Sequence, residues 1–518
     1  MRPSHPNHVT HERTTMTTAK TIPNQALTDD ERTLVDTAQR WFVDHRDEYL
    51  DTLCAAVRIP SVTDPDHPVE HGPYGRAVRD VFDFALGKAR DAGFATDDYD
   101  GHAVGYWYGE RGDKDIALVS HLDVVKPGDG WTFEPFEPVV RDGYVIGRGA
   151  SDNKGAAIVD LFLLRFFKEL GHEFKHPVRV IYGGDEEEEM TDLQYVVAHY
   201  GAPYQAVITD SPYPVNTIQK ARLYADLTLP AGPVLGSLES GYSRFQIPGT
   251  ASVDLVGIPY DRAAAALAQL AATDAELAGR LHLGVANDGT PTLTAEGVTG
   301  HPAFPEGTVN PILLIATALD RTGLLAGADA AAAHAIATWL DGYYGEGIGL
   351  YRRDEESGTS FFNAGAAHPA PGGVKLELSI RLAITQMRDE VESTLAERAA
   401  EVGGHVETVF FGDAYYVPKT DPRVQLLLGV FDEIMGTHAD TVALASGTHA
   451  RVIPNAVNFG PGFSEHERTV RPIVGRPDFI EEGKGGSHGA DEWVSLDNLT
   501  STFVMYALAL TRLDAYLD

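Results

Sequence analysis

The fold of this chain is decided by the stretch IALVSHLDVV, residues 116–125. Its apolar start predicts a buried strand, because short continuous apolar runs are typical of strands that are covered on both faces. His121 and Asp123 stand two residues apart in it, and side chains at positions i and i+2 of a strand point to the same face. Such a strand has no structural need for an imidazole beside a carboxylate, although a paired core histidine would explain the two residues equally well.

Apolar strands alternate with amphipathic helices on both sides of this stretch. We expect further strands at 176–184 and 204–210, with a helix at 156–171 and another after residue 190. Earlier in the chain, helical spacing of apolar residues predicts helices over 28–58 and 75–94, the second ending at Gly93. This alternation is typical of an α/β domain built on a mainly parallel sheet.

A second domain is expected to be inserted in the α/β domain. The chain of 518 residues is too long for one ordinary core, and its composition becomes richer in Ala, Gly, Thr and Pro after residue 213. We therefore predict an α+β insert over 214–385, built from two related halves. The α/β domain, which carries the candidate chemistry, would comprise 28–213 and 386–518. Residues 1–27 are polar, lack the apolar segment of a secretory signal, and are expected to form a disordered arm.

Composition excludes several classes of function. Asp and Glu number 75 against 41 Lys and Arg, which gives a net charge of −34 and argues against nucleic acid as a partner. No apolar run approaches the ~20 residues that a membrane helix needs. A single cysteine, Cys54, excludes an internal disulfide and fits a reducing compartment, so a cytoplasmic location is expected.

Acidic residues follow the predicted strands at three places. Asp152 in GRGASDNKG stands before a helix, where an N-cap is the structural alternative. The run DEEEE, residues 185–189, follows one strand, and a solvated surface face is the alternative there. Asp210 ends another strand. Because α/β proteins bind ligands at the carboxyl ends of their strands, the three together favour a site over three separate structural explanations.

A crevice of this composition needs cations. Carboxylates that are crowded together raise one another's pKa unless positive charge neutralises them. Imidazole with carboxylate suits zinc, with cobalt or manganese as substitutes. One ion would not need so many acids, so the residues favour two divalent ions with one carboxylate bridging them and a water held between.

The motifs SHLDVV, GRGASDNKG, GGDEEEE, TDSPYPV and GGSHGADEW follow one another along the chain. In this order they resemble the co-catalytic zinc metallopeptidase family of aminoacylase, carnosinase, succinyl-diaminopimelate desuccinylase and carboxypeptidase G. The block over residues 120–155 most resembles the PepV-type dipeptidase branch, and the resemblance spans nearly the whole chain from about residue 28. It implies a mainly parallel-sheet zinc-peptidase domain with an inserted α+β lid domain.

The resemblance also implies a role for each candidate residue. There would be five metal ligands, namely His121 and Asp210 for one ion, Glu187 and His488 for the other, and Asp152 as the bridge. Asp123 would orient His121. Glu186 would be the general base, which takes a proton from the bridging water and passes it to the leaving amine.

Two residues of the insert are implied to bind substrate. GHPAFPEGTVNP resembles the family's lid motif, so His301 would donate a hydrogen bond to the oxyanion of the tetrahedral intermediate. Arg381, at the end of VKLELSIR, would hold the substrate carboxylate, with a surface strand arginine as the alternative. The chain departs from the branch at two places: Phe245 or Gln246 replaces an asparagine, and His449 replaces an aromatic residue.

The expected activity is a metal-dependent dipeptidase that acts on dipeptides or short peptides with a free C-terminal carboxylate. An N-acyl amino-acid deacylase on the same dimetal site is the alternative, because the same ions would hydrolyse either amide. A serine hydrolase would match GGSHG, residues 485–489, but no buried strand is predicted before it and no histidine follows His488. A non-catalytic binding protein would lack a ligand or the base. The long insert suggests a monomer, with a homodimer as the alternative.

Overall fold

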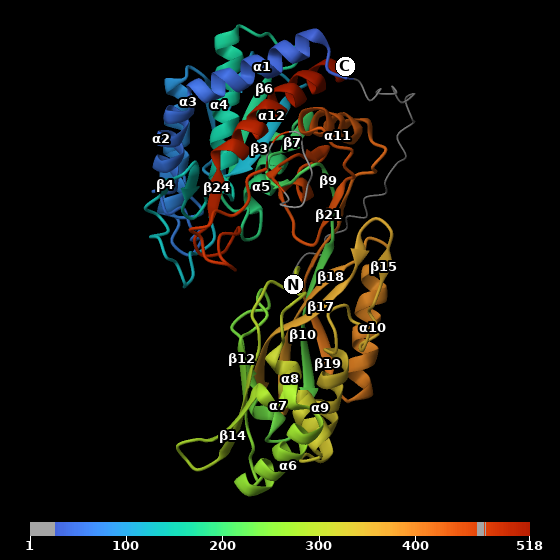
Figure 1. The fold of residues 1–518 in the computed structure, drawn as a ribbon. Helices are drawn as coiled ribbons and strands as arrows, with labels where there is room; N and C mark the ends of the chain where they lie inside the picture. Colours follow the sequence, from blue (N-terminus) through green and yellow to red (C-terminus); the bar gives the residue numbers. More distant parts are fainter. Residues whose placement is uncertain (1–25, 464–470, 472) are drawn as a thin grey trace. The chain divides into compact units, whose positions relative to one another are not determined.

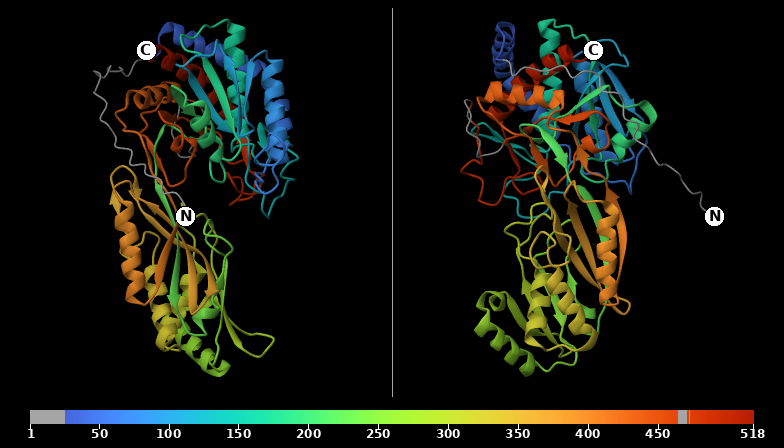
Figure 2. Two further views of the ribbon diagram at one scale, coloured as in Figure 1. Left: turned by 180° about the vertical axis from the view of Figure 1, so that it is seen from behind. Right: turned by 90° about the vertical axis from the view of Figure 1, so that its right-hand side faces the viewer.

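The computed structural model describes residues 26–463, 471 and 473–518, and its chain divides into two compact units (Figure 1 and Figure 2). The first unit comprises residues 1–215, 417–441 and 455–518, and the second comprises residues 216–416 and 442–454. The arm predicted over residues 1–27 lies almost entirely outside the described residues.

The first unit is built on a sheet whose central strands are parallel. Six strands of this nine-stranded sheet belong to the first unit, and in sheet order they are β1 (Ala95–Tyr99), β2 (Ala103–Tyr108), β6 (Val178–Gly183), β3 (Ile116–His121), β7 (Gln205–Ile208) and β22 (Ala456–Asn458). Strands β6, β3, β7 and β22 run parallel, and β1 and β2 form an antiparallel edge. The α/β fold with a mainly parallel sheet that the sequence predicts is therefore confirmed.

Strand β3 shows why its sequence is a continuous apolar run. All residues of β3 and of its neighbour β6 are buried, as expected for strands covered on both faces. In the register of the two strands His121 lies opposite Gly183. The segments that follow β3 and β6 therefore leave the sheet side by side at its carboxyl edge.

Helices of the first unit pack through large aromatic side chains. They are α1 (Asp29–Asp44), α2 (Arg46–Val57), α3 (Arg76–Asp91), α4 (Lys154–Leu170), α5 (Thr191–Tyr200), α11 (Pro422–Met435) and α12 (Leu496–Tyr516). Phe503 of α12 stacks on Phe42 of α1 with ring centroids 4.6 Å apart, and Phe166 of α4 meets it edge-on at 5.7 Å. The helix predicted over 28–58 is divided at His45, which ends α1 and precedes α2.

A small antiparallel sheet joins two distant segments of the first unit. Its strands are β4 (Val139–Arg141), β5 (Tyr144–Ile146) and β24 (Trp493–Ser495), with β5 in the centre. Strand β5 lies shortly before Asp152 in the sequence, and β24 lies shortly after His488. The pairing therefore brings together two loops that carry candidate ligands.

The second unit is an eight-stranded antiparallel sheet with helices on one face. In sheet order its strands are β13 (Leu281–Val285), β14 (Pro291–Glu296), β12 (Thr250–Asp254), β11 (Glu239–Ser240), β17 (Phe361–Ala370), β18 (Gly373–Leu382), β10 (Ala221–Pro230) and β19 (His405–Gly412). Its longer helices, which share one hydrophobic core with the sheet, are α6 (Tyr260–Thr273), α8 (Pro311–Thr322), α9 (Gly327–Trp339) and α10 (Arg388–Glu401). Across the described residues no helix combines the length and the apolar character needed to cross a bilayer.

The second unit ends later than the insert expected over residues 214–385. Val391, Leu395 and Ala399 of α10 lie in its hydrophobic core, and β19 pairs with β10. Apolar periodicity shows that a helix has a buried face but not which sheet that face covers, so the sequence assigned α10 to the wrong side of the boundary. The suggestion of two related halves stays a prediction.

Candidate metal centre

Acidic and imidazole side chains gather at the carboxyl edge of the first unit's sheet. His121 is the last residue of β3, the segment Asp185–Glu187 follows β6, and Asp210 follows β7. Asp152 lies just before α4, and His488 lies just before β24. The structure thus brings together all five residues that the sequence proposes as metal ligands.

Asp152 lies between the two histidines. Its Oδ1 is 3.1 Å from His121 Nε2, and its Oδ2 is 3.3 Å from His488 Nε2. Asp210 Oδ2 lies 3.7 Å from His121 Nε2, and Glu187 Oε2 lies 2.8 Å from His488 Nε2. The five side chains therefore form two groups that share Asp152, and each group adds one imidazole and one further carboxylate.

The structural alternatives for these acids do not hold. Helix α4 begins at Lys154 with Asn153 in the N-cap position, so Asp152 is not its N-cap. In the run 185–189 the first two acids are buried, and the side chain of Glu187 is only 5 % exposed. Only the last two acids of the run are exposed, as a solvated face would require.

Asp123 contacts both His121 and the segment that follows β6. His121 Nδ1 is 3.0 Å from the backbone oxygen of Asp123 and 3.3 Å from its Oδ1. A donor at Nδ1 leaves the lone pair of Nε2 facing Asp152, which is the orientation that a metal ligand needs. Asp123 Oδ2 accepts a hydrogen bond of 3.1 Å from the backbone N–H of Glu187. One carboxylate therefore orients a residue of each ligand group.

Sequence reasoning missed Glu492, which is fully buried beside the Asp152 segment. Its Oε1 accepts hydrogen bonds from the backbone N–H groups of Ser151 and Asp152, at 2.8 and 3.0 Å. Its Oε2 accepts from Gly149 N at 3.0 Å and from Arg148 Nη1 at 2.6 Å. The segment before α4 is therefore held in place through its backbone by one carboxylate.

Arg148 extends this support to the second histidine. It is 1 % exposed, and its Nη2 donates to the backbone oxygens of His488 and Gly489 at 3.0 and 3.1 Å. The Arg148–Glu492 ion pair thus joins the loop of Asp152 to the loop of His488. The signal in the sequence was a charged residue within each of two glycine-rich ligand motifs, GRGASDNKG and GGSHGADEW.

Negative charge exceeds positive charge in the candidate centre. Burial raises the pKa of Glu186 well above its usual range, and the carboxylate of Asp210 adds to the effect. Burial, followed by the charge of Asp152, raises the pKa of Glu187 to about 7. For His488, burial lowers the pKa, but the carboxylates of Asp152 and Glu187 outweigh it and raise the value to about 11.

Buried oxygens in the centre point to the same need for cations. Within the described residues, Glu186 Oε1 and Glu187 Oε1 are buried and have no hydrogen-bond partner. A buried carboxylate oxygen without a donor is costly unless a cation or proton satisfies it. Carboxylate and imidazole are donors that zinc and similar divalent ions accept, so the residues fit a metal centre.

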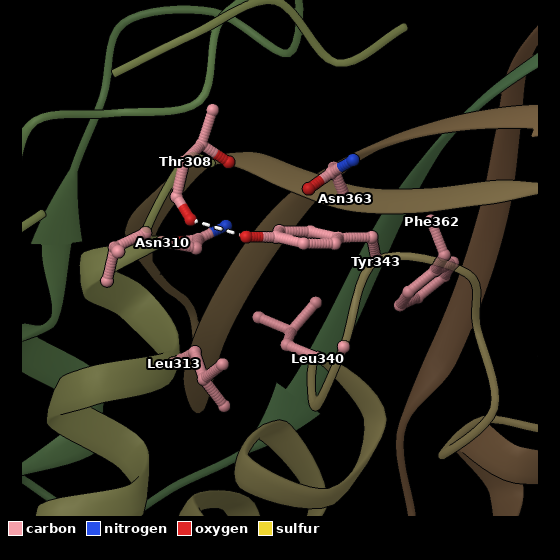
Figure 3. A pocket seen from close by; sticks show the side chains of 9 residues that line it. Thr308, Asn310, Leu313, Leu340, Tyr343, Phe362 and Asn363 are labelled. Atoms are coloured by element: carbon pink, nitrogen blue, oxygen red, sulfur yellow. Dashed lines mark hydrogen bonds between the residues drawn. The ribbon is translucent and has the colours of Figure 1, made fainter. Parts of the chain in front are cut away.

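His301 lies in the second unit, on the loop between β14 and α8. The backbone N–H of Ala303 donates to His301 Nδ1 at 3.1 Å, so the neutral ring carries its proton on Nε2. A hydrogen bond holds the same loop in place, because Tyr343 Oη donates to the backbone oxygen of Thr308 at 2.7 Å (Figure 3). Both residues line a cavity of about 320 Å³. Asn310, which lines the same cavity, caps α8 through its side-chain oxygen.

Arg381 also lies in the second unit, on β18, and is 4 % exposed. Its Nε donates to the backbone oxygen of Ala445 at 3.0 Å, and its Nη1 donates to Ser379 Oγ at 3.2 Å. The alternative of a surface strand arginine is therefore wrong. Of the two positions that depart from the dipeptidase branch, Phe245 is 56 % exposed and His449 is fully buried.

The serine hydrolase alternative fails on local structure. Residues 485–489 form turns, and in the described part of the chain the strand that precedes them is the two-residue β23 (Pro461–Gly462). A nucleophile elbow needs a strand that leads directly into a sharp turn and a helix. The segment therefore lacks the geometry that would present Ser487 as a nucleophile.

The chain is similar in sequence and in fold to known peptidases. Residues 117–512 match the model of peptidase family M20/M25/M40. The chain is 28% identical over 471 residues to the putative dipeptidase YtjP of Bacillus subtilis (strain 168), covering 88% of this chain and 95% of the relative. It is 25% identical over 477 residues to the Beta-Ala-Xaa dipeptidase of Lactobacillus delbrueckii subsp. lactis, covering 90% and 96%. Human carnosine dipeptidase 1 has a similar fold, with a TM-score of 0.56 at 17% identity over 93% of this chain and 99% of that structure.

Proposed function

Because the chain belongs to peptidase family M20/M25/M40, we propose that it is a metal-dependent dipeptidase for dipeptides or short peptides with a free C-terminal carboxylate. The observation that carries this proposal is the pair of ligand groups that share Asp152, with one oxygen toward each histidine. Relatives named as dipeptidases align over most of the chain and support the same substrate class.

Two divalent ions would be held by the five residues of the centre, with zinc as the expected metal and manganese or cobalt as substitutes. His121 and Asp210 would hold one ion, Glu187 and His488 would hold the other, and Asp152 would contribute to both. The distances around Asp152 and the unsatisfied buried oxygens support this assignment. When bound, such ions polarise the scissile carbonyl and lower the pKa of water in the centre.

Glu186 is the proposed general base. It is adjacent to Glu187 in the chain and contributes to a group with His121 and Asp210 whose ligand atoms lie within 4.8 Å of one another. Its carboxylate accepts the proton of the attacking water and then passes it to the nitrogen of the leaving amine. Asp123 is a positioning residue, because it contacts His121 and the backbone of Glu187 rather than the substrate.

Two residues of the second unit are proposed to contact the substrate. The Nε2–H of His301, set by the hydrogen bond from Ala303, suits a donor to the oxyanion of the tetrahedral intermediate. The guanidinium of Arg381 suits a bidentate contact with the C-terminal carboxylate.

Metal removal combined with kinetics tests the proposal. The protein is dialysed against a chelator, reloaded with zinc, manganese or cobalt, and assayed on dipeptides beside N-acyl amino acids. Dipeptide hydrolysis should disappear with the metal and return on reloading. Glu186→Gln should lower kcat by at least ~100-fold, because it removes the proton acceptor. Metal content measured on the same variant should remain that of the unsubstituted protein.

The other outcomes of this experiment contradict particular parts of the proposal. Hydrolysis of only the N-acyl compounds would make the protein a deacylase on the same centre. Dipeptide hydrolysis that survives full metal removal would overturn the metal mechanism. A Glu186→Gln variant with unchanged kcat would exclude Glu186 as the base.

We also propose a cytoplasmic monomer. The single cysteine of the chain, buried Cys54, supports a reducing compartment. The length of the second unit supports a monomer. Sedimentation at the concentration used for kinetics tests the oligomeric state, and a stable dimer would contradict it.

A further inference from the structure

One face of the second unit's sheet is turned away from the helices. On β10 the alternate residues Leu223 and Ala225 lie in the hydrophobic core, so Arg222 and Tyr224 lie on the other face. In the antiparallel register of β10 and β18, Arg222 is directly opposite Arg381. Residues that are directly opposite share a face, so the two arginine side chains are neighbours.

Neither arginine is neutralised by an acid in the part of the chain that the structure describes. Within the described residues no carboxylate oxygen lies within 4.0 Å of either guanidinium. Arg381 donates only to neutral oxygens, and Arg222 Nε is buried without a hydrogen-bond partner. Like charges directly opposite one another destabilise a sheet. In a chain with 75 acidic residues and 41 basic ones, an uncompensated pair of cations is unexpected.

Elsewhere on the same face the cations are compensated. Arg244 Nη2 lies 2.9 Å from Asp226 Oδ1 and 3.4 Å from Glu377 Oε2. Lys375 contacts the same two carboxylates at 3.4 and 3.2 Å. Asp226 and Glu377 are also directly opposite one another on β10 and β18. On β10 and β18, positive charge without a counterion among the described residues is therefore confined to the end that carries Arg222 and Arg381.

Aromatic rings surround this end of the face. The Arg381 guanidinium carbon lies 5.4 Å from the ring centre of Tyr224, and that of Arg222 lies 5.7 Å from the ring centre of Phe410. Arg222 is also opposite Gly412, which has no side chain to cover it. The aromatic rings reduce the exposure of the two guanidinium groups to water, and this strengthens their attraction for an anion.

We propose that Arg222 and Arg381 form a site for two carboxylates, so that preferred substrates are dipeptides whose C-terminal residue is aspartate or glutamate. The inference rests on the proposed dipeptidase function. Arg381 takes the α-carboxylate, and Arg222 takes the carboxylate of the side chain. A substrate with one carboxylate leaves one guanidinium uncompensated, whereas a substrate with two neutralises the pair.

Matched dipeptides test the proposal, because glutamine has the shape of glutamate without its charge. We expect kcat/KM for Ala-Glu to exceed that for Ala-Gln by ~10-fold or more, the effect of one charge-assisted contact. Arg222→Gln should bring this ratio close to one, and Arg222→Lys should retain part of it. Arg244→Gln, which changes a compensated arginine on the same face, is the control and should leave the ratio unchanged.

A binding measurement separates this inference from the proposed function. In calorimetry with the metal-loaded protein, free L-glutamate should bind more tightly than L-glutamine, and Arg222→Gln should abolish the difference. Equal binding of the two amino acids, or an Ala-Glu to Ala-Gln ratio near one in the unsubstituted protein, would overturn the inference. Hydrolysis of Ala-Gln would then still support a dipeptidase. If no dipeptide is hydrolysed while glutamate binds selectively through Arg222, the site stands and the dipeptidase proposal fails.

Discussion

Arg148 and Glu492 show how two buried charges can organise a site without touching the reaction. A buried ion pair contributes little more to stability than an apolar pair of similar volume would. Removing one partner, however, leaves the other charged and unpaired in the interior. Glu492 accepts from three backbone N–H groups around Asp152, and Arg148 donates to two backbone oxygens around His488. Loss of either side chain therefore disturbs ligands of both proposed ions.

Arg148→Met is expected to lower the free energy of unfolding by about 3–5 kcal/mol, the usual cost of breaking a buried pair. Metal affinity should also fall by ~10- to 100-fold, as for other residues that orient ligands. Denaturant unfolding and chelator competition measure the two quantities. Arg165→Met is the control, because Arg165 pairs with the half-exposed Glu48 and should change stability by less than about 1 kcal/mol. Equal effects of the two substitutions would contradict the role given to Arg148.

Asp160 of α4 is a buried carboxyl group that accepts hydrogen bonds from two hydroxyl groups. Ser120 Oγ lies 2.6 Å from Asp160 Oδ2 and 2.7 Å from Thr209 Oγ1, which in turn lies 3.1 Å from the backbone oxygen of Val119. Ser120 Oγ and Thr209 Oγ1 both donate to Asp160 Oδ2, at 2.6 and 2.9 Å, and both hydrogen bonds favour the ionised carboxylate. Burial outweighs these two bonds and raises the pKa of Asp160 to about 7.

Asp160→Asn is expected to change how stability depends on pH. Below pH about 4 the acid is neutral in the folded and unfolded chain, so its ionisation costs nothing. Between pH about 4 and 7 only the unfolded chain ionises, and the folded protein loses up to ~4 kcal/mol of stability. The variant escapes this loss, so its unfolding free energy relative to the unsubstituted protein should rise between pH about 4 and 8. Chemical unfolding across this range, with the two proteins compared at each pH, measures the difference. A constant difference would contradict a neutral Asp160.

At the scale of elements, α12 joins the start of the chain to its end. Phe503 is fully buried and contacts Trp41 and Phe42 of α1 and Phe166 of α4. Burial of one aromatic side chain contributes about 1.5–3 kcal/mol, and a cavity left in its place adds to the loss. The helices that cover the sheet therefore depend on one aromatic cluster.

Phe503→Ala is expected to lower the free energy of unfolding by about 3–5 kcal/mol, because the cluster cannot close over the space of a phenyl ring. Denaturant unfolding measures this change. Val43→Ala on α1, at a side chain that is 49 % exposed, is the control and should change stability by less than about 0.5 kcal/mol. A loss at Phe503 no larger than at Val43 would mean that α12 is not held by this cluster.

At the scale of the molecule, the excess of acidic residues gives the whole chain a large net negative charge that affects its stability. At a net charge of −34 the acidic side chains repel one another, and this repulsion destabilises the folded chain. Salt screens the repulsion and so weakens it. The melting temperature of the metal-loaded protein should therefore rise as sodium chloride is increased from about 0.01 to 0.2 M. Choline chloride should raise it equally, because screening does not depend on the identity of the cation. A rise with sodium alone would indicate a specific ion site instead, and no rise would contradict the importance of repulsion.

The sequence alone determined the class of the fold and the residues of the candidate centre. Apolar runs of strand length and helices of amphipathic spacing are local signals, and they correctly predicted the parallel sheet of the first unit. Because parallel strands end at a common edge, His121, Glu187 and Asp210 could be expected together once the strands were recognised. The end of the insert was misplaced for the opposite reason, since the core that receives α10 is formed by strands far away in the chain.

Only the tertiary structure decided which charged residues support the centre and which have no acidic partner among the described residues. Arg148 and Glu492 are separated by more than three hundred residues, yet their contact holds two ligand loops. The cross-strand pair of Arg222 and Arg381 likewise follows from the register of β10 and β18, which periodicity does not specify. A side chain's type states what it can bind, but burial and distant neighbours decide whether that capacity is already satisfied.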